Sequence, residues 1–464
     1  MWEKLKFQAG IRVLISFSLI EAHSQLYSMH LLVHSWIRNK VPKEQKTHLY
    51  HIARALLSCS VVDDHNFDNY AFCRSLALHI KSNASHALEL KLQSVYYEDE
   101  YNKFILVFHH VGDWEELEKL LLVQANWRAT MLGAESYETL ESMANLAFTY
   151  NNQGRWDEAE KLLMNVINAS KAKLGPDHPD TLSIMGNLAF TCGKQGRWDE
   201  AEKLFVDVVN ARKEKLGSDH PDTLHGMDNL ASIYDCQGRW DEAEKLLVDV
   251  VNERKEKLGS DGDHPDTLRS MGNLASVYVN QGWWDDGEKL VADVINAKKE
   301  KLGSDHLDTL VSMENLASIY NRQGWWDEAE KLGMNVINAS KAKLGSDHLD
   351  TLHCMATLAS VYCNQGRWDE AERQEVEVIN ARKEKLGSEH PETLFGMVNL
   401  AYTYRGQGRL VEAHSLLSHA VDTMQKVMGS QHPIVLQSTK FINTLLKEMQ
   451  HKEICYNTRT QRYA

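Results

Sequence analysis

The residues of this chain that could do chemistry recur at regular intervals, and histidine is the most regular of them. Histidines that could ligate a metal ion stand about one repeat apart, at His178, His220, His264, His306, His348, His390 and His432. Two histidines that bind one metal ion from a helix are usually four residues apart. Because each of these histidines is expected in its own loop, we interpret them as helix caps or loop-packing residues and predict no metal site.

A faint resemblance to a calcium-binding loop lies at Asp261, Asp263 and Asp266. Such a loop needs a glycine at its sixth position and a glutamate that closes it. Both of these residues are misplaced here, so no calcium site is predicted.

Two features bear on the compartment. The chain has seven scattered cysteines without CxxC spacing, which is typical of buried thiols in a reducing compartment. An apolar run at 13–20 is too short to span a membrane, and no small-x-small cleavage site follows it. We therefore predict a cytoplasmic protein without a membrane anchor.

The sequence contains no set of residues that would support catalysis. A phosphate-binding loop of the form GxxxxGK[ST] is missing, and so is a strand followed by an aspartate that could hold magnesium. No nucleophile–base set or metal cluster stands out either. We predict that the chain is not an enzyme, takes no cofactor and binds no nucleotide.

Asparagine forms a second regular series. It returns at the same position of successive repeats, with Thr357 as the exception, at Asn145, Asn187, Asn229, Asn273, Asn315 and Asn399. Asparagine is a poor residue in the middle of a helix, because its side chain competes for backbone hydrogen bonds. Some interaction must offset that cost at each position.

A 42-residue repeat positions these side chains. The string Gly-Arg-Trp-Asp-Glu-Ala-Glu-Lys-Leu starts at Gly154, Gly196 and Gly238, and close variants start at Gly282, Gly324 and Gly366. One step measures 44 residues because of the extra pair Asp261-Gly262. A fixed period of this length is typical of a solenoid, in which each unit must stack on its neighbours to bury its apolar face.

Each repeat is predicted to form two helices. The first begins at a His-Pro-Asp/Glu-Thr-Leu segment, where proline suits the first turn and the acid suits the positive end of the helix dipole. It ends at a Gln-Gly pair, and the second helix begins at the tryptophan that follows. In the repeat at 181–222, Trp198, Ala201, Phe205 and Val208 form one apolar stripe. These features predict an all-α superhelical solenoid.

The pattern resembles the tetratricopeptide repeat (TPR) family in the longer form found in kinesin light chains. In the unit from Thr139, the matching residues are Ala147, Tyr150, Gly154, Trp156 and Ala159. The repeat pattern predicts an array at 97–434. The amphipathic residues 435–450 are predicted to form a cap helix, and the tail at 451–464 is predicted to be disordered because it is polar. The array divides into units at 97–138, 139–180, 181–222, 223–266, 267–308, 309–350, 351–392 and 393–434.

The resemblance implies that the asparagine series faces a concave groove, where the amides would hold the backbone of an extended peptide or protein segment. Residues one before and three after each asparagine are expected to face the same groove. A second role stays open, in which each asparagine ties adjacent repeats together. Both roles would produce a regular series.

The N-terminal segment does not follow the repeat. Residues 1–48, with Met29-His30 followed by Leu-Leu-Val-His-Ser-Trp36, resemble the end of the winged helix in fungal NB-ARC signalling ATPases. In that family a Met-His pair closes on the nucleotide, so Met29 and His30 are expected to be a nucleotide-sensing relic. Residues 49–96 are expected to form a helical linker.

Charge is unevenly spread along the chain. Residues 1–96 carry 11 Lys and Arg against 7 Asp and Glu, whereas the whole chain has a formal net charge of −14. The array is therefore acidic, which disfavours nucleic acid as a partner because phosphates would be repelled.

These observations favour a non-enzymatic scaffold that binds protein or peptide. The resemblance suggests the sensor half of an NB-ARC/TPR protein, used in non-self recognition or cell-death signalling. The alternative is a kinesin-light-chain-like cargo adaptor, which should carry heptads before the array, and residues 1–96 show none. An enzyme targeted by its repeats is the third possibility.

Overall fold

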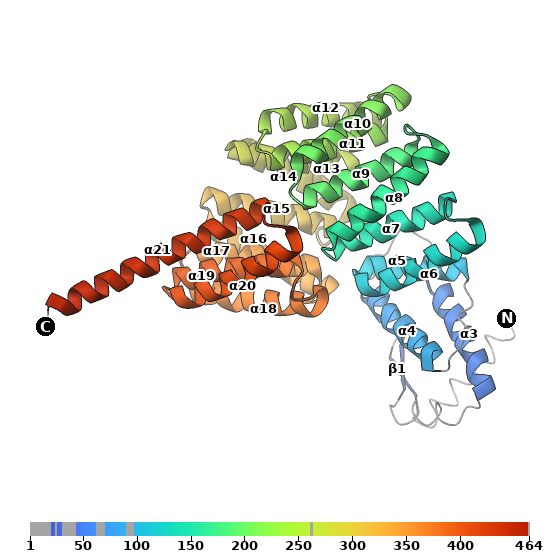
Figure 1. Ribbon diagram of the computed structural model, residues 1–464, viewed down its shortest axis with the longest axis horizontal. Helices are drawn as coiled ribbons and strands as arrows, with labels where there is room; N and C mark the ends of the chain where they lie inside the picture. Colours follow the sequence, from blue (N-terminus) through green and yellow to red (C-terminus); the bar gives the residue numbers. More distant parts are fainter. Residues whose placement is uncertain are drawn as a thin grey trace. The chain divides into compact units, whose positions relative to one another are not determined.

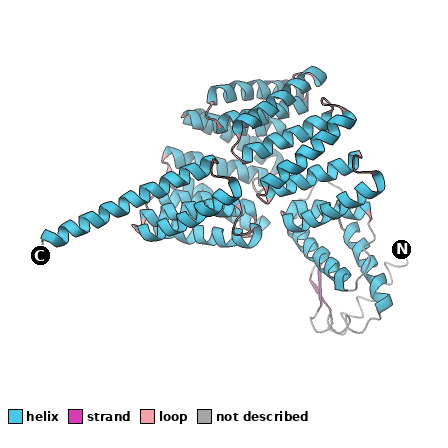
Figure 2. Ribbon diagram, viewed as in Figure 1, coloured by secondary structure: helices cyan, strands magenta, loops and turns pink. Residues whose placement is uncertain are grey.

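The chain is almost entirely helical in a computed structural model that describes residues 20–23, 26–29, 43–61, 70–89, 97–259 and 263–462 (Figure 2). It forms two compact units, residues 1–67 with 72–107 and residues 68–71 with 108–464. The expected all-α repeat architecture is confirmed, with paired helices repeating through the second unit (Figure 1).

The first unit contains a short hairpin and the first helices. Strands β1 (Ile20–His23) and β2 (Leu26–Met29) pair antiparallel. Helices α3 (Lys43–Cys59) and α4 (Tyr70–Glu89) occupy the segment predicted as a helical linker, although α3 begins earlier, within 1–48. Much of that predicted winged-helix-like segment, including His30, lies outside the described residues, so the winged-helix interpretation stays a prediction.

A buried arginine joins helices α3 and α5 (Glu98–Val111) in this unit. Arg54 Nε donates to Glu100 Oε2 at 2.5 Å. Its guanidinium lies over the rings of Tyr101 and Phe104, 4.8 and 5.2 Å from their centroids. The ion pair and the two aromatic faces together compensate for the burial of the charge.

The second unit is a series of helix pairs, each made of an A helix and a B helix. The A helices are α7 (Tyr137–Asn152), α9 (Pro179–Lys194), α11 (Pro221–Cys236), α13 (Pro265–Gln281), α15 (Leu307–Gln323), α17 (Leu349–Asn364) and α19 (Pro391–Gly406). The B helices are α6 (Trp114–Leu132), α8 (Trp156–Leu174), α10 (Trp198–Leu216), α12 (Trp240–Leu258), α14 (Trp284–Leu302), α16 (Trp326–Leu344), α18 (Trp368–Leu386) and α20 (Leu410–Met428).

Local sequence signals set the ends of these helices as predicted. The histidine that precedes each A helix from α9 to α19 accepts a hydrogen bond from the backbone N–H two residues later, as His178 Nδ1 does from Asp180 at 3.3 Å. The predicted capping role of these histidines is therefore confirmed. The turn glycine has a positive φ, such as +74° at Gly196, which few other residues adopt.

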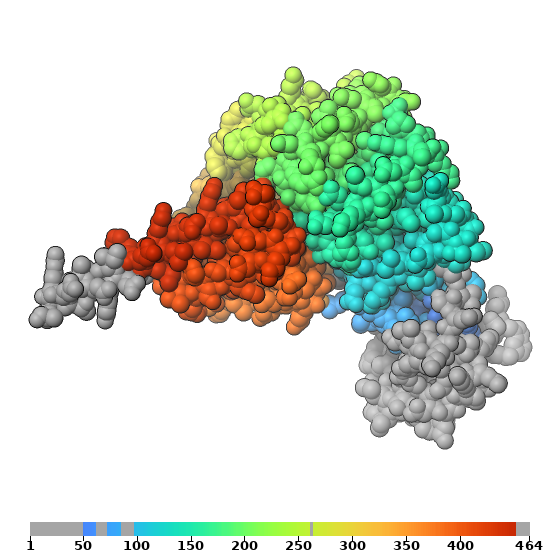
Figure 3. Space-filling model, in the orientation of Figure 1, coloured from blue at the N-terminus to red at the C-terminus, as the bar shows by residue number. Residues whose placement is uncertain are grey.

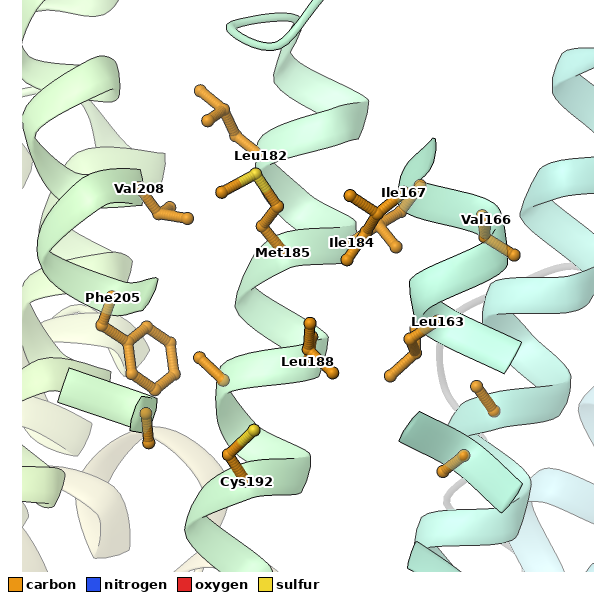
Figure 4. Close-up of a cluster of buried hydrophobic side chains, with 14 of the residues drawn as sticks. Leu163, Val166, Ile167, Leu182, Ile184, Met185, Leu188, Cys192, Phe205 and Val208 are labelled. Carbon is orange, nitrogen blue, oxygen red and sulfur yellow. The ribbon is translucent and has the colours of Figure 1, made fainter. Parts of the chain in front are cut away.

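Apolar side chains fill the space between neighbouring helices. In Figure 4, Ile184 of α9 lies near Ile167 of α8, while Met185 of α9 lies near Phe205 and Val208 of α10. The repeated alanines, such as Ala189 and Ala201, are fully buried, so the backbones can approach closely. One A helix thus buries two faces, one against each flanking B helix.

The array also contacts itself across a long sequence separation, along a line that we call the seam. His390 Nε2 lies 3.0 Å from the carbonyl oxygen of Asn152, and His432 Nε2 lies 3.2 Å from that of Lys194. The ring of Trp156 stacks on His432 with centroids 6.0 Å apart. Figure 3 shows the red C-terminal surface against the green surface of the early repeats. The seam therefore closes a turn of the superhelix.

The C-terminus differs from its prediction. Helix α21 (Pro433–Arg462) is 30 residues long, so helix replaces most of the expected disordered tail at 451–464 and extends past the expected cap helix at 435–450. No glycine or proline occurs after Pro433 that would stop the helix. Among the described helices, none is long and apolar enough to cross a membrane.

The seam can be tested with two turn glycines that share one conformation. Gly154 and Gly238 have φ of +74° and +73°. A Cβ at Gly154 would lie 2.5 Å from Cδ of Pro391 across the seam, whereas a Cβ at Gly238 would meet nothing within 4 Å. Both alanine variants pay about 1 kcal/mol for the backbone, and overpacking adds about 1–3 kcal/mol at Gly154 only. Urea unfolding should therefore show Gly154→Ala to be the less stable variant. Equal stability of the two variants would contradict the seam.

Candidate peptide-binding groove

The asparagine series lies along one exposed face of the A helices, which we call the asparagine face. Asn145, Asn187, Asn315 and Asn399 are exposed, and Asn229 and Asn273 are half-buried. Within the described part of the chain, only Asn229 has a side-chain contact at hydrogen-bond distance, with His225 Nε2 at 3.4 Å. The other five amides are thus open to a ligand, and the structure offers them no role in tying repeats together. Their use in binding stays a prediction.

Thr357, which replaces asparagine in the series, connects two adjacent repeats, as the asparagines do not. Thr357 Oγ1 donates to Glu314 Oε1 of the preceding repeat at 2.9 Å. His353 Nε2 lies 3.3 Å from the same carboxylate oxygen. Where this position ties two repeats together, the residue is threonine rather than asparagine.

The residues beside each asparagine divide into two groups. Those three positions later are exposed on the asparagine face, as predicted, at Phe148, Phe190, Ser232, Ser276, Ser318, Ser360 and Tyr402. Of those one position earlier, Asp228 and Glu314 are buried against a neighbouring repeat and the rest are half-buried, with Gly272 on the wall of a cavity. A groove role for this position stays a prediction. The helix pitch rotates this position by about 100° from the asparagine, toward the next A helix.

A buried ion pair explains why Asp228 is tolerated inside. Its Oδ2 lies 2.7 Å from Arg254 Nη1, and both side chains are 3 % exposed. Ser270 Oγ donates to Oδ1 of the same carboxylate at 2.8 Å. Three consecutive helices, α11 to α13, therefore meet at one polar cluster, and removing a single partner would leave a buried charge.

Predicted groove residues line three cavities. The cavity between α13 and α15 has a volume of about 390 Å³ and is lined by Asn273, Ser276 and Asn315. Lys298 closes one side of it, donating to the Asp308 carbonyl at 3.1 Å and to Ser312 Oγ at 2.9 Å. Burial lowers the pKa of Lys298. The second cavity has a volume of about 790 Å³ and is lined by Asn399, Ser360 and Tyr402.

A third cavity follows the seam and has a volume of about 520 Å³. Its walls include Phe148 and Phe190 from the asparagine face, with His390 and Phe395 on the opposite side. The ring of Phe148 stacks on His109 at a centroid distance of 5.7 Å. The predicted groove residues thus fall into more than one cavity.

A series of basic residues at the end of the B helices was not predicted from the sequence. Each donates to a backbone carbonyl at the start of the next A helix, as Arg212 does to Asp222 at 2.9 Å and Arg382 does to Glu392 at 3.0 Å. The signal was available in the repeat spacing, and the series is Arg128, Arg212, Arg254, Lys298 and Arg382. These residues are framework, because their donors are used within the array.

A second framework series uses the arginine of the repeated Gly-Arg-Trp segment. Arg239 Nη1 lies 2.8 Å from Glu202 Oε1 of the preceding repeat, and its guanidinium lies 4.3 Å from the Tyr234 ring centroid. Gln237 Nε2 donates to Glu202 Oε2 at 2.9 Å. Burial opposes ionisation of Glu202, but the hydrogen bonds from Arg239 and Gln237 outweigh it, so its pKa is lowered. The same ion pair joins Glu118 to Arg155, Glu160 to Arg197, Glu330 to Arg367 and Glu372 to Arg409. The stacking on tyrosine recurs at Arg155, Arg367 and Arg409 but not at Arg197, where Cys192 replaces the tyrosine.

Two repeats replace this arginine with tryptophan. Trp283 and Trp325 lie against Tyr278 and Tyr320, with centroids 5.6 Å apart in both pairs. The aromatic contact with the tyrosine is therefore kept while the ion pair is lost.

The structure does not test the nucleotide-sensing prediction at Met29 and His30. Met29 ends β2, and His30 and Asp261 lie outside the described residues. Across the described ranges, no group of three or more His, Cys, Asp or Glu residues is arranged to hold a metal ion.

Comparison with known families gives one broad match. A family model described as tetratricopeptide repeat matches residues 137–214, 184–252, 266–342, 308–384 and 357–426. A search of curated proteins gives no match to the chain.

Solved structures with similar repeats include a candidate kinesin light chain from Podospora anserina with nearly identical TPR-like repeats. It is 30 % identical, spans 44 % of this chain and 95 % of its own, and has a TM-score of 0.39. A STAND protein with a tetratricopeptide repeat sensor from Pyrococcus horikoshii is 14 % identical, with coverage of 90 % and 60 % and a TM-score of 0.41. The quorum sensor NprR from B. thuringiensis is 15 % identical, with coverage of 81 % and 97 % and a TM-score of 0.41. TM-scores this low assign no function.

The framework role of the Gly-Arg-Trp arginine can be tested with replacements taken from the chain itself. Arg239→Ala should lose both the ion pair and the contact with Tyr234, at a cost of about 1 kcal/mol. Arg239→Trp should recover the aromatic contact, as at Trp283 and Trp325, and so lose less stability. Thermal unfolding followed by circular dichroism compares the two. The interpretation fails if the tryptophan variant is the less stable one.

Proposed function

Because the chain belongs to the tetratricopeptide repeat family, we propose that it is a non-enzymatic scaffold that binds an extended peptide or protein segment along the asparagine face. The observation that carries this proposal is the series of six amides, of which four are exposed and five have no side-chain partner inside the described array. A primary amide can donate to a peptide carbonyl and accept from a peptide N–H at the same time. Amides spaced by one repeat would therefore hold a peptide backbone largely independently of its sequence.

The framework residues support this assignment by elimination. The Gly-Arg-Trp arginines and the basic residues at the B-helix ends already have partners within the array. Apart from Asn229, which contacts His225, the asparagines have none, yet they occupy a position where asparagine lowers helix stability. A stability cost without an internal compensation is expected at residues that serve binding.

The finer proposal concerns the signalling class. The Met29-His30 segment and its neighbours favour the sensor half of an NB-ARC/TPR signalling protein, in which the array would recognise non-self material or a cell-death signal. The array alone fits a kinesin-light-chain-like cargo adaptor equally well. The N-terminal segment is what favours the first class, since residues 1–96 lack heptads. Cytoplasmic location is part of the same proposal.

Replacing three neighbouring amides tests the binding role. The triple variant Asn229→Ala, Asn273→Ala and Asn315→Ala should bind a peptide selected by phage display on the wild-type chain about 100-fold more weakly, at about 1 kcal/mol for each lost amide. Isothermal titration calorimetry measures the affinity. Helix content should be unchanged or increased, because alanine is the better helix former.

A matched control removes three exposed asparagines from B helices instead. Asn210→Ala, Asn252→Ala and Asn296→Ala should leave the affinity unchanged. Equal affinities of both triple variants, or loss of helical signal in the first, would overturn the proposal in favour of a framework role.

The absence of a phosphate loop gives a second test. Magnesium-ATP and ADP should leave the melting temperature of the purified chain unchanged, because a ligand that does not bind the native state cannot stabilise it. A clear upward shift with nucleotide would show that the Met29-His30 segment still belongs to a working site.

A further inference from the structure

One repeat carries a carboxylate where the others carry a core side chain. Glu375 of α18 is 6 % exposed. The other six B helices from α8 to α20 have apolar residues or glycine at this position, namely Leu163, Phe205, Leu247, Val291, Gly333 and Leu417. A buried carboxyl group at this position lowers the stability of the fold unless it has hydrogen-bond partners.

Glu375 is only half satisfied by the protein. Thr403 Oγ1 of α19 donates to its Oε2 at 2.7 Å, and Cys363 Sγ of α17 lies 3.2 Å from the same threonine oxygen. Within the described ranges, no hydrogen bond reaches the other oxygen, Oε1. Arg405 also lines the cavity, and its charge is neutralised by Glu448 of α21, whose Oε1 lies 2.6 Å from Arg405 Nη2.

The carboxyl group borders the cavity of about 790 Å³ on the asparagine face. Buried residues, Glu375 and Leu410, form its floor, and exposed residues, among them Asn399 and Tyr402, form its rim. The cavity therefore lies beside one of the predicted groove amides and has the buried Glu375 in its lining.

A glycine that occurs at its position only in the next repeat shapes the cavity wall. Gly406 replaces the larger residues that end the other A helices at the same position, such as Asn152, Lys194 and Asn364. A Cβ at Gly406 would lie 2.5 Å from Cε3 of Trp368, so the indole ring occupies the space that a side chain would fill. Glu375 and Gly406 both depart from the repeat pattern, and both line the same cavity.

We propose that this cavity binds the side chain of a lysine in the peptide held along the asparagine face, with the ammonium group on Glu375 Oε1. This inference rests on the proposed function. Trp368, Tyr402 and Leu410 would contact the aliphatic stem of the lysine, which buries well against apolar and aromatic surfaces.

The single carboxylate oxygen of Glu375 that has no hydrogen-bond partner favours lysine over arginine as the ligand. A guanidinium group pairs best with both oxygens of a carboxylate at once. Thr403 already occupies Oε2, so a single oxygen is left for the ligand. An ammonium group is a point charge that a single oxygen can receive.

Binding is expected to weaken as pH falls. Burial raises the pKa of Glu375 to about 7, a hydrogen bond from Thr403 opposes the shift, and the nearby Glu372 carboxylate adds to it. The other titratable groups that line the cavity are Cys363, Tyr402, Arg405, Glu448 and His451. Only the ionised form of Glu375 attracts an ammonium group, so affinity should be about tenfold weaker at pH 6 than at pH 8.

The test uses two small probes that differ by one ammonium group. N-acetyl-lysine methylamide should give saturation-transfer NMR signals with the full chain, and its affinity should exceed that of N-acetyl-norleucine methylamide about tenfold or more. Equal binding of the two probes would overturn the proposal.

Two variants locate the site. Glu375→Leu restores the residue found at Leu163, Leu247 and Leu417, so it should fold at least as stably as the wild-type chain and lose the preference for lysine. Glu375→Gln keeps the shape of the side chain and should lose the same preference together with its pH dependence. If the lysine preference survives in the leucine variant, the site lies elsewhere and the proposal is wrong.

The failure of this inference is distinguishable from the failure of the proposed function. Asn229, Asn273 and Asn315 lie outside this cavity. The triple alanine variant at these positions should therefore bind N-acetyl-lysine methylamide as tightly as the wild-type chain does. If it does so while peptide binding is also unchanged, the cavity site stands and the asparagine role falls.

Discussion

No repeat in this array can bury its own apolar surface, and the rest of the structure depends on that constraint. Each A helix lies between two B helices and needs both to cover its side chains. Fully buried alanines permit the close approach, and the contacts between repeats fix its geometry. The glutamate of one B helix receives the arginine and the glutamine of the next turn, and this joint recurs along the array. A basic residue at the end of most B helices fastens the start of the next A helix.

Repetition of one joint also determines where distant parts meet. Every repeat adds the same small rotation, so the superhelix brings the turns near Gly154 and Gly196 against His390 and His432. The histidines that cap α19 and α21 therefore have two roles. Each accepts a hydrogen bond from its own helix through Nδ1, and each reaches a carbonyl oxygen across the seam through Nε2. The same histidine therefore caps its own helix and also connects the two ends of one superhelical turn.

A binding role is expected for residues that lower the stability of the fold and have no part in the packing between repeats. The repeated arginines, alanines and tryptophans are explained by stacking. The exposed asparagines are not, since they weaken their helices and lack partners within the described array. Glu375 and Gly406 are departures of a different kind, because each occurs in a single repeat and both line one cavity. The asparagine series would hold a peptide backbone at any point along the array. Glu375 and Gly406, which occur in one repeat each, would fix the register of the peptide.

The sequence by itself determined what depends on neighbours within a few residues. Helix ends, the capping histidines, the positive-φ glycines and the apolar stripes all follow from the repeat, and the structure has them where they were predicted. The tail after residue 450 was misjudged because polarity was given more weight than the absence of a helix breaker. The partners of Asp228 and of the Gly-Arg-Trp arginines were missed because they belong to a different repeat. Only the tertiary structure decided these pairings, together with the seam and the cavity at Glu375, because they depend on the rotation accumulated between stacked repeats, which no local pattern specifies.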